Sequence, residues 1–152
     1  MPGDAMQDRQ MTITRHIAAR PETVWRCLTD PDLLPRWFGP EGYSCRTKEI
    51  RLGEGGLWRF DMIGPDGHVW PNRHRYSGLI AAERLEYLMD ADTDTDLPCH
   101  VLVTLAAERG GTRYTLCMTF PTVEACATAR NFGAEALGMT TLAKLAGLAE
   151  SL

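Results

Sequence analysis

The sequence predicts an α+β fold in which a curved antiparallel sheet of about seven strands wraps around a long C-terminal helix. Three observations support this prediction. Short alternating segments joined by turns run through residues 43–120, a proline-free stretch without alternation follows over residues 122–152, and two short helices are expected after the first strand. A sheet with one apolar face must cover that face, and the C-terminal helix is the one long element able to do so.

The first strand and the two short helices are predicted from the N-terminal third of the chain. Residues 11–18 alternate weakly between apolar and polar side chains, which favours a strand. Pro21 followed by Glu22 is typical of a helix start, because proline fits the first helical position and a carboxylate complements the helix dipole. Pro31 repeats this signal for a second helix, which is expected to end near Trp37.

Six further strands are expected before the C-terminal helix. The last two show the clearest period-two alternation, and a glycine-rich turn joins them as a hairpin. Because the connections between consecutive strands are short, the pairing should be antiparallel. The predicted strands are 43–52, 57–63, 73–80, 85–91, 99–107 and 112–120.

Residues 122–152 are predicted to form one helix, in which Gly133 and Gly138 each weaken the helix by ~1 kcal/mol and allow a bend. At ~100° per residue one face carries mainly small side chains, and we expect this face to lie on the sheet. Three leucines fall on the nearly opposite face of the helix, away from the sheet. A homodimer that uses them therefore stays an alternative. The predicted inner face is Ala125, Ala129, Phe132, Ala136, Met139, Ala143 and Ala146, and the leucines are Leu137, Leu145 and Leu148.

Composition limits the class of protein. At 152 residues, a single domain over residues 11–152 is expected, preceded by a disordered polar leader over residues 1–10 that lacks the apolar centre of a signal peptide. The net charge of −4 argues against a nucleic-acid partner. No apolar run approaches the ~20 residues that cross a bilayer. Five scattered cysteines are expected to be reduced thiols, which favours a cytoplasmic location.

Several segments together resemble the helix-grip fold of the START-like and birch-pollen-allergen-like (SRPBCC) superfamily. They are IAARPETVW at 17–25, TDPDLLPRWFGP at 29–40, the glycine pair at 55–56, GPDG at 64–67, ERL at 83–85, GTR at 111–113 and TLAKLA at 141–146. Within that superfamily the chain is similar to the Hsp90-ATPase-activator-homologue-like (AHSA1-like) group of bacterial domains. The resemblance extends in collinear order over residues 11–152. It departs at Met139, where the group often has tryptophan after a glycine.

The resemblance implies a cavity between the sheet and the C-terminal helix that binds a small hydrophobic, aromatic or lipid-like ligand. Aromatic rings near the second short helix would close one end of it, and methionines suit a pocket that tolerates several shapes. The cavity residues expected on this basis are Trp37, Phe38, Trp58, Phe60, Met62, His74, Tyr76, Met89, Val103, Met118, Phe132 and Met139.

Two other functions stay open. His74 and Tyr76 fall on one face of a strand and would be the acid–base candidates of a polyketide cyclase or dehydratase, although no carboxylate is placed to tune the histidine. Binding without catalysis is the leading hypothesis, and we expect no catalytic residues. A role as cofactor of an Hsp90-type chaperone is not expected, because the second domain of such co-chaperones is missing.

No metal site or bound cofactor is expected. The four histidines lack ligand spacing. The aspartates over residues 90–96 mimic the opening of a calcium loop, but they lack its glycine and glutamate at the required positions.

Overall fold

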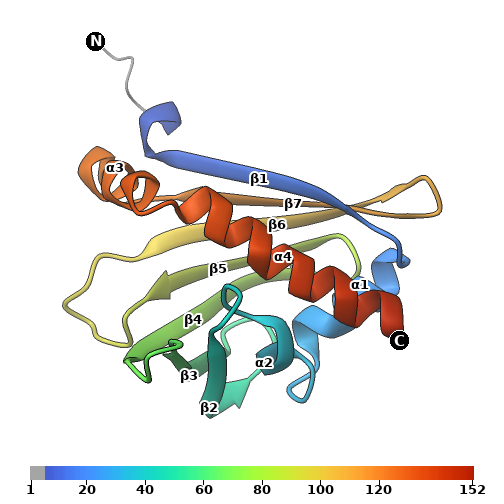
Figure 1. Cartoon of the computed structure of the whole chain (residues 1–152), viewed down its shortest axis with the longest axis horizontal. Helices are drawn as coiled ribbons and strands as arrows, with labels where there is room; N and C mark the ends of the chain where they lie inside the picture. The colour runs from blue at the N-terminus through green and yellow to red at the C-terminus, as the bar shows by residue number, and fades with distance from the viewer. Residues whose placement is uncertain (1–5) are drawn as a thin grey trace.

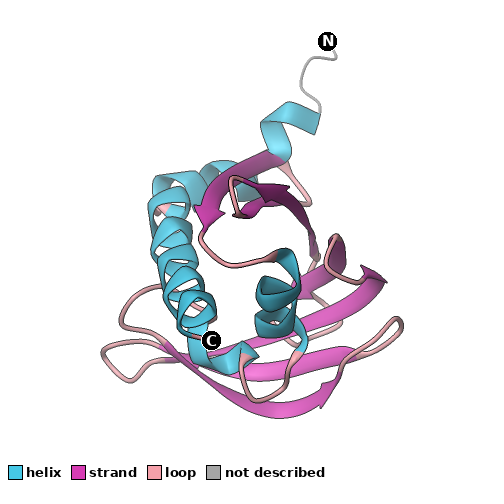
Figure 2. Ribbon diagram, turned by 90° about the vertical axis from the view of Figure 1, so that its right-hand side faces the viewer, coloured by secondary structure: helices cyan, strands magenta, loops and turns pink. Residues whose placement is uncertain are grey.

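The computed structural model describes residues 6–152 as a seven-stranded antiparallel sheet with the helices on its concave side (Figures 1 and 2). The strand order is β1-β7-β6-β5-β4-β3-β2. The strands are β1 (Gln10–Ile17), β2 (Ser44–Arg51), β3 (Leu57–Ile63), β4 (Val69–Ile80), β5 (Arg84–Asp90), β6 (Cys99–Glu108) and β7 (Gly111–Thr119). The helices are η2 (Met6–Arg9, 3-10), α1 (Pro21–Thr29), α2 (Leu34–Trp37), α3 (Val123–Asn131) and α4 (Ala134–Ser151).

The predicted fold class is confirmed, and each predicted strand is present. β4 is longer than expected, because it begins at Val69. Pro71 pairs with Asp61 of β3, whereas the pairing of β4 with β5 begins only at Arg73 and Asp90. Pro71 therefore lies where β4 has one neighbour, and its missing N–H leaves no gap in the ladder to β5.

The polar leader differs from the expectation where the structure describes it. Residues 6–9 form the 3-10 helix η2, and Gln10 opens β1. Arg9 ties this turn to the end of the sheet, since its Nη1 donates to the carbonyl oxygen of Phe120 and its own carbonyl accepts from the Phe120 amide. Residues 1–5 of the expected leader lie outside the described residues.

The C-terminal segment forms two helices, so the prediction of a single long helix is wrong. α3 ends at Asn131, α4 begins at Ala134, and Gly133 between them has φ 82°. Glycine adopts this left-handed conformation without a steric penalty and therefore commonly ends a helix. Within residues 6–152, no helix combines the length and apolar character required to cross a membrane.

The break also changes which side chains of α4 face the sheet. Phe132 is 77% exposed and Met139 is 40% exposed, and Ala136 and Ala143 are exposed as well. The predicted inner face is therefore wrong at these four positions. Because α4 starts anew after Gly133, a helical phase counted from residue 122 does not carry over. Leu145 is buried and Leu148 packs against the core, so these leucines no longer argue for a homodimer. The buried face of α4 consists of Leu142, Leu145, Ala146 and Ala149.

The two short helices close one end of the curved sheet. α1 buries Val24, Cys27 and Leu28. The indole Nε1 of Trp37 in α2 donates to the carbonyl oxygen of Cys27 at 2.8 Å, which fixes α2 against α1. A buried hydrogen bond of this kind is favoured because an unpaired indole N–H in the core would be costly. This contact directs the chain after α2 into the space under α4.

Candidate functional site

A cavity of about 320 Å³ lies between the concave face of the sheet and α4. It results from the bend of the sheet, which separates its centre from α4, and from the small side chains at this part of α4. Its lining from the sheet is Met11, Ile13, Met62, Asn72, Met89, Tyr114, Leu116 and Met118. Its lining from helices and loops is Trp37, Phe38, Gly39, Pro40, Ala134, Leu137, Gly138, Thr141 and Leu142.

Four methionines from four different strands line this cavity. Met11 belongs to β1, Met62 to β3, Met89 to β5 and Met118 to β7. Methionine is unbranched and polarisable, so a wall built from it adapts to ligands of differing outline and contacts aromatic rings favourably. The methionine-lined wall of the cavity therefore suits an apolar or aromatic ligand.

The cavity carries few polar groups, and no charged side chain contributes to its lining. The Asn72 amide donates to the carbonyl oxygen of Trp70 at 3.0 Å, and the Thr141 hydroxyl donates to that of Leu137 at 3.4 Å. Tyr114 is buried, which raises the pKa of its hydroxyl, so that this group is a neutral donor at any physiological pH. An ion inside the cavity would lose its hydration without gaining a charged partner.

Five residues proposed from the sequence line the cavity: Trp37, Phe38, Met62, Met89 and Met118. Trp37 and Phe38 come from the end of α2, and the methionines come from strands that alternate their side chains into the concave face. The aromatic pair thus borders the cavity at the α2 end.

Trp58 and Phe60 do not line the cavity. Their rings stack on each other with centroids 3.7 Å apart, and both are completely buried. Phe38 covers them with its ring centroid 5.5 Å from Trp58 and 5.6 Å from Phe60. These two residues of β3 are core, and Phe38 separates them from the cavity.

His74, Tyr76 and Val103 face inward, but they line only a void of about 10 Å³, roughly the space of one water molecule. Burial lowers the pKa of His74 to about 3, and its Nε2 has no hydrogen-bond partner in the described part of the chain. The His74 ring stacks on Tyr87 at 4.2 Å. The neutral histidine therefore has no room for a substrate beside it, which removes the geometric basis of the cyclase hypothesis.

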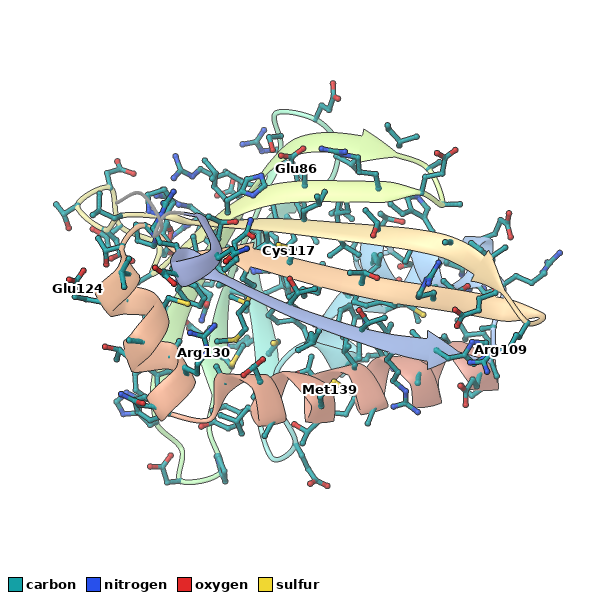
Figure 3. All side chains as sticks on the ribbon, turned by 90° about the horizontal axis from the view of Figure 1, so that it is seen from above. Glu86, Arg109, Cys117, Glu124, Arg130 and Met139 are labelled. Atoms are coloured by element: carbon teal, nitrogen blue, oxygen red, sulfur yellow. The ribbon has the colours of Figure 1, made fainter. Side chains whose placement is uncertain are left out.

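Phe132 and Met139 do not belong to the cavity lining. Met139 is labelled on α4 in Figure 3. The two residues were assigned by winding α3 and α4 as one helix. In their place α4 contributes Leu137 and Thr141, which the correct phase brings to the lining.

Several lining residues were absent from the sequence-based set. Met11 pairs with Met118, and Ile13 pairs with Leu116, across β1 and β7. The available signal was the alternation of β1 and β7, because residues opposite each other in an antiparallel pair share a face. What the sequence did not provide was the pairing of β1 with β7, which are remote in the chain.

The loop after α2 covers part of the cavity and is held by α4. The Lys144 Nζ donates to the carbonyl oxygens of Gly39 and Tyr43, both at 3.1 Å, and of Pro40 at 3.4 Å. The Thr140 hydroxyl accepts from the Glu41 amide at 3.0 Å. α4 thus holds the loop that supplies Gly39 and Pro40 to the lining.

Comparison with known protein families gives a match over residues 18–150 to the family described as Activator of Hsp90 ATPase homolog 1-like protein. No significant match was found among curated proteins.

Solved structures of similar proteins share the fold along nearly the whole chain. A protein from Nitrosomonas europaea is 26% identical with a TM-score of 0.86, and the match covers 97% of each chain. A protein from Mycobacterium smegmatis is 22% identical with a TM-score of 0.85, covering 96% of this chain and 94% of that one. The AHSA1 protein from Silicibacter pomeroyi is 21% identical with a TM-score of 0.74, covering 94% and 99%. The last two show the fold alone.

Proposed function

The chain belongs to the Activator of Hsp90 ATPase homolog 1-like family, and on that premise we propose that it binds a small apolar or aromatic molecule in the cavity under α4. The observation that supports the proposal is the cavity itself, whose about 320 Å³ are lined by methionine, aromatic and aliphatic side chains. A cavity of ~150 Å³ accommodates one benzene ring, so this one has room for about two fused rings. Its volume falls at the lower end of the ~300–1,000 Å³ range of ligand pockets.

The expected affinity is moderate. An aromatic group that buries ~150–250 Å² of surface gains roughly 4–6 kcal/mol at ~25 cal/mol per Å². Such a gain corresponds to a dissociation constant between about forty micromolar and one millimolar. A method that detects weak binding at high ligand concentration is therefore the right one.

The test uses the methionine methyl groups as reporters. With methyl-labelled methionine, naphthalene should cause saturable NMR shifts of Met11, Met62, Met89 and Met118, which line the cavity. Met139 is an internal control, because it is exposed and lies outside the lining. If the four methyl signals do not move, or if Met139 moves equally, naphthalene does not bind in the cavity and the proposal is wrong.

A pair of variants on α4 adds a second control. Thr141→Trp places a large ring in the cavity lining and should abolish the naphthalene shifts. Ala143→Trp places the same ring on an exposed position of the same helix and should leave them unchanged. Retention of naphthalene binding by folded Thr141→Trp protein would place the ligand elsewhere.

A further inference from the structure

A second, more open hollow lies next to the cavity, at the end of the sheet where α3 is packed. It has a volume of about 740 Å³ and runs between the ends of β4, β5 and β6 and the side of α3. Asn72 and Met89 line both the cavity and this groove. The two spaces therefore share a wall and adjoin each other.

The floor of the two spaces is continuous along single strands. On β7 the side chain of Met118 lines the cavity, and Phe120, which directly follows the strand two residues further on, lines the groove. On β4 the same step leads from Asn72 to Trp70. Since side chains two apart in extended chain lie on one face, the same face of the sheet continues from the cavity into the groove.

The helix that faces the sheet changes at the break between the two C-terminal helices, from α4 over the cavity to α3 beside the groove. Leu137 of α4 covers the cavity, whereas Ala125, Thr128 and Ala129 of α3 border the groove. Gly133, whose backbone is in the left-handed conformation, lies between these two helices. The small side chains of α3 leave the groove wide, and Trp70 at its floor stays 50% exposed.

The groove is more polar than the cavity but provides no cation. Its hydrogen-bonding side chains include Asn72, Thr95 and Thr128, and its lining contains neither lysine nor arginine. Of its two carboxylates, Asp90 is buried and paired with Arg73 and Arg75, whereas Asp96 is exposed. An anionic head group in the groove would therefore lie near the charge of Asp96 with no cation in the lining, whereas a hydroxyl group would find donors and acceptors.

We propose that the cavity and the groove form one continuous site for an elongated, uncharged amphiphile. Its apolar end lies in the cavity under α4, and its hydroxylated end lies in the groove beside α3. Trp70 and Leu97, which is 66% exposed, would be covered by the chain of this ligand. The proposal rests on the proposed function and specifies the ligand class of the same site.

The test compares 1-hexanol, which fits within the cavity, with 1-dodecanol, which must reach into the groove. Each added methylene that is buried strengthens binding about fourfold, so affinity should keep rising from hexanol to dodecanol. Dodecanoate should bind at least about tenfold more weakly than dodecanol, because its carboxylate would lose hydration near Asp96 without a cation in the lining. An affinity that stops rising once the cavity is filled, or dodecanoate that binds as well as dodecanol, would overturn the proposal.

Two tryptophan variants of α3 separate the groove from the cavity. Ala129→Trp fills the groove at a residue that lines it, and Ala127→Trp places the same ring on an exposed position outside both linings. Ala129→Trp should weaken dodecanol binding at least about tenfold and leave hexanol binding unchanged, while Ala127→Trp should change neither.

The outcomes distinguish this proposal from the one on which it rests. Binding of hexanol together with dodecanol binding that is insensitive to Ala129→Trp overturns the continuous site alone. Failure of the native protein to bind either alcohol, together with unmoved methionine signals in naphthalene, overturns both proposals.

Discussion

The ammonium group of Lys144 donates a hydrogen bond to the carbonyl oxygen of Gly39 at 3.1 Å and thereby joins α4 to the loop that covers the cavity. The same Nζ also reaches the carbonyl oxygens of Pro40 and Tyr43. Hydrogen bonds from a charged donor are stronger than neutral ones, and three of them converge here. Lys144 therefore supplies most of the hydrogen bonds that hold this loop to α4, and Thr140 adds one through the Glu41 amide.

Replacing this lysine should open the loop. In Lys144→Met the three carbonyl groups lose their donor, and we expect a loss of about 2 kcal/mol in the free energy of unfolding. The amides of residues 39–43 should also exchange faster with solvent, because the loop loses most of its hydrogen bonds to α4. Urea denaturation and amide hydrogen exchange measure these two effects.

Lys48→Met is the matched control. Lys48 pairs with Asp61 and Asp92 at the sheet surface, at 3.3 Å and 3.2 Å. Partly exposed ion pairs contribute ~0–1 kcal/mol, and this one lies outside the lining of the cavity. Equal exchange rates of the 39–43 amides in the two variants would contradict the role of Lys144.

The break between α3 and α4 should depend on glycine at position 133. In Gly133→Ala a side chain must adopt φ 82°, which costs about 1–2 kcal/mol of stability. Gly147→Ala should have the opposite sign, since a Cβ there meets open space within α4 and alanine favours the helix by roughly 0.5–1 kcal/mol. Thermal unfolding of both variants tests this, and stabilisation by Gly133→Ala would show that the two helices readily merge.

The strands and the antiparallel pairing of consecutive strands were predictable from the sequence because both depend on local signals, whereas the pairing of β1 with β7 was not. The alternation and the turns define the strands, and short connections require antiparallel neighbours. Which side chains of the C-terminal helices face the sheet was harder to predict than the strands. Gly133 was recognised as a weak point, but no residue count shows whether a glycine bends a helix or ends it. That choice decided the assignments of Phe132 and Met139.

The sequence also did not show which side chains of the concave face reach the cavity and which are covered by other residues. Trp58, Phe60 and Met62 share one face of β3, as the alternation indicates. Only Met62 reaches the cavity, because Phe38 covers the other two. Which member of an apolar row is covered depends on a contact between α2 and β3 that period-two alternation does not encode.

Burial of His74 should make stability depend on pH. Its pKa is about 3 in the folded chain, because burial disfavours the imidazolium and the charge of Asp90 offsets this only in part, against ~6.5 when unfolded. The stabilising contribution is therefore complete above pH ~6.5. It is lost as the pH falls from about 6.5 toward 3, at up to ~1.4 kcal/mol per pH unit.

His74→Phe removes this dependence and retains a ring. Between pH 7.5 and pH 5, the variant should lose about 2 kcal/mol less stability than the native protein in urea denaturation. His68→Phe, at an exposed position, should behave as the native protein does. The same pH profile for His74→Phe and the native protein would show that His74 takes up its proton without unfolding.

Phe38 should act as the partition between the cavity and the small void at His74. Its ring lies 5.0 Å from His74 and lines both spaces. Phe38→Ala should join them and cost about 3 kcal/mol of stability, because the ring fills space that the neighbours do not close. Phe132→Ala removes a ring that is 77% exposed and should change stability by less than ~0.5 kcal/mol.

The enlarged space in Phe38→Ala protein should also admit a larger ligand. Three fused rings fit where two fitted before, so anthracene should raise the thermal midpoint of Phe38→Ala protein more than that of the native protein. A ligand that binds only the folded state stabilises it in proportion to its affinity, so the shift reports binding directly. Equal shifts in Phe38→Ala and Phe132→Ala proteins would mean that the ring of Phe38 does not limit the cavity.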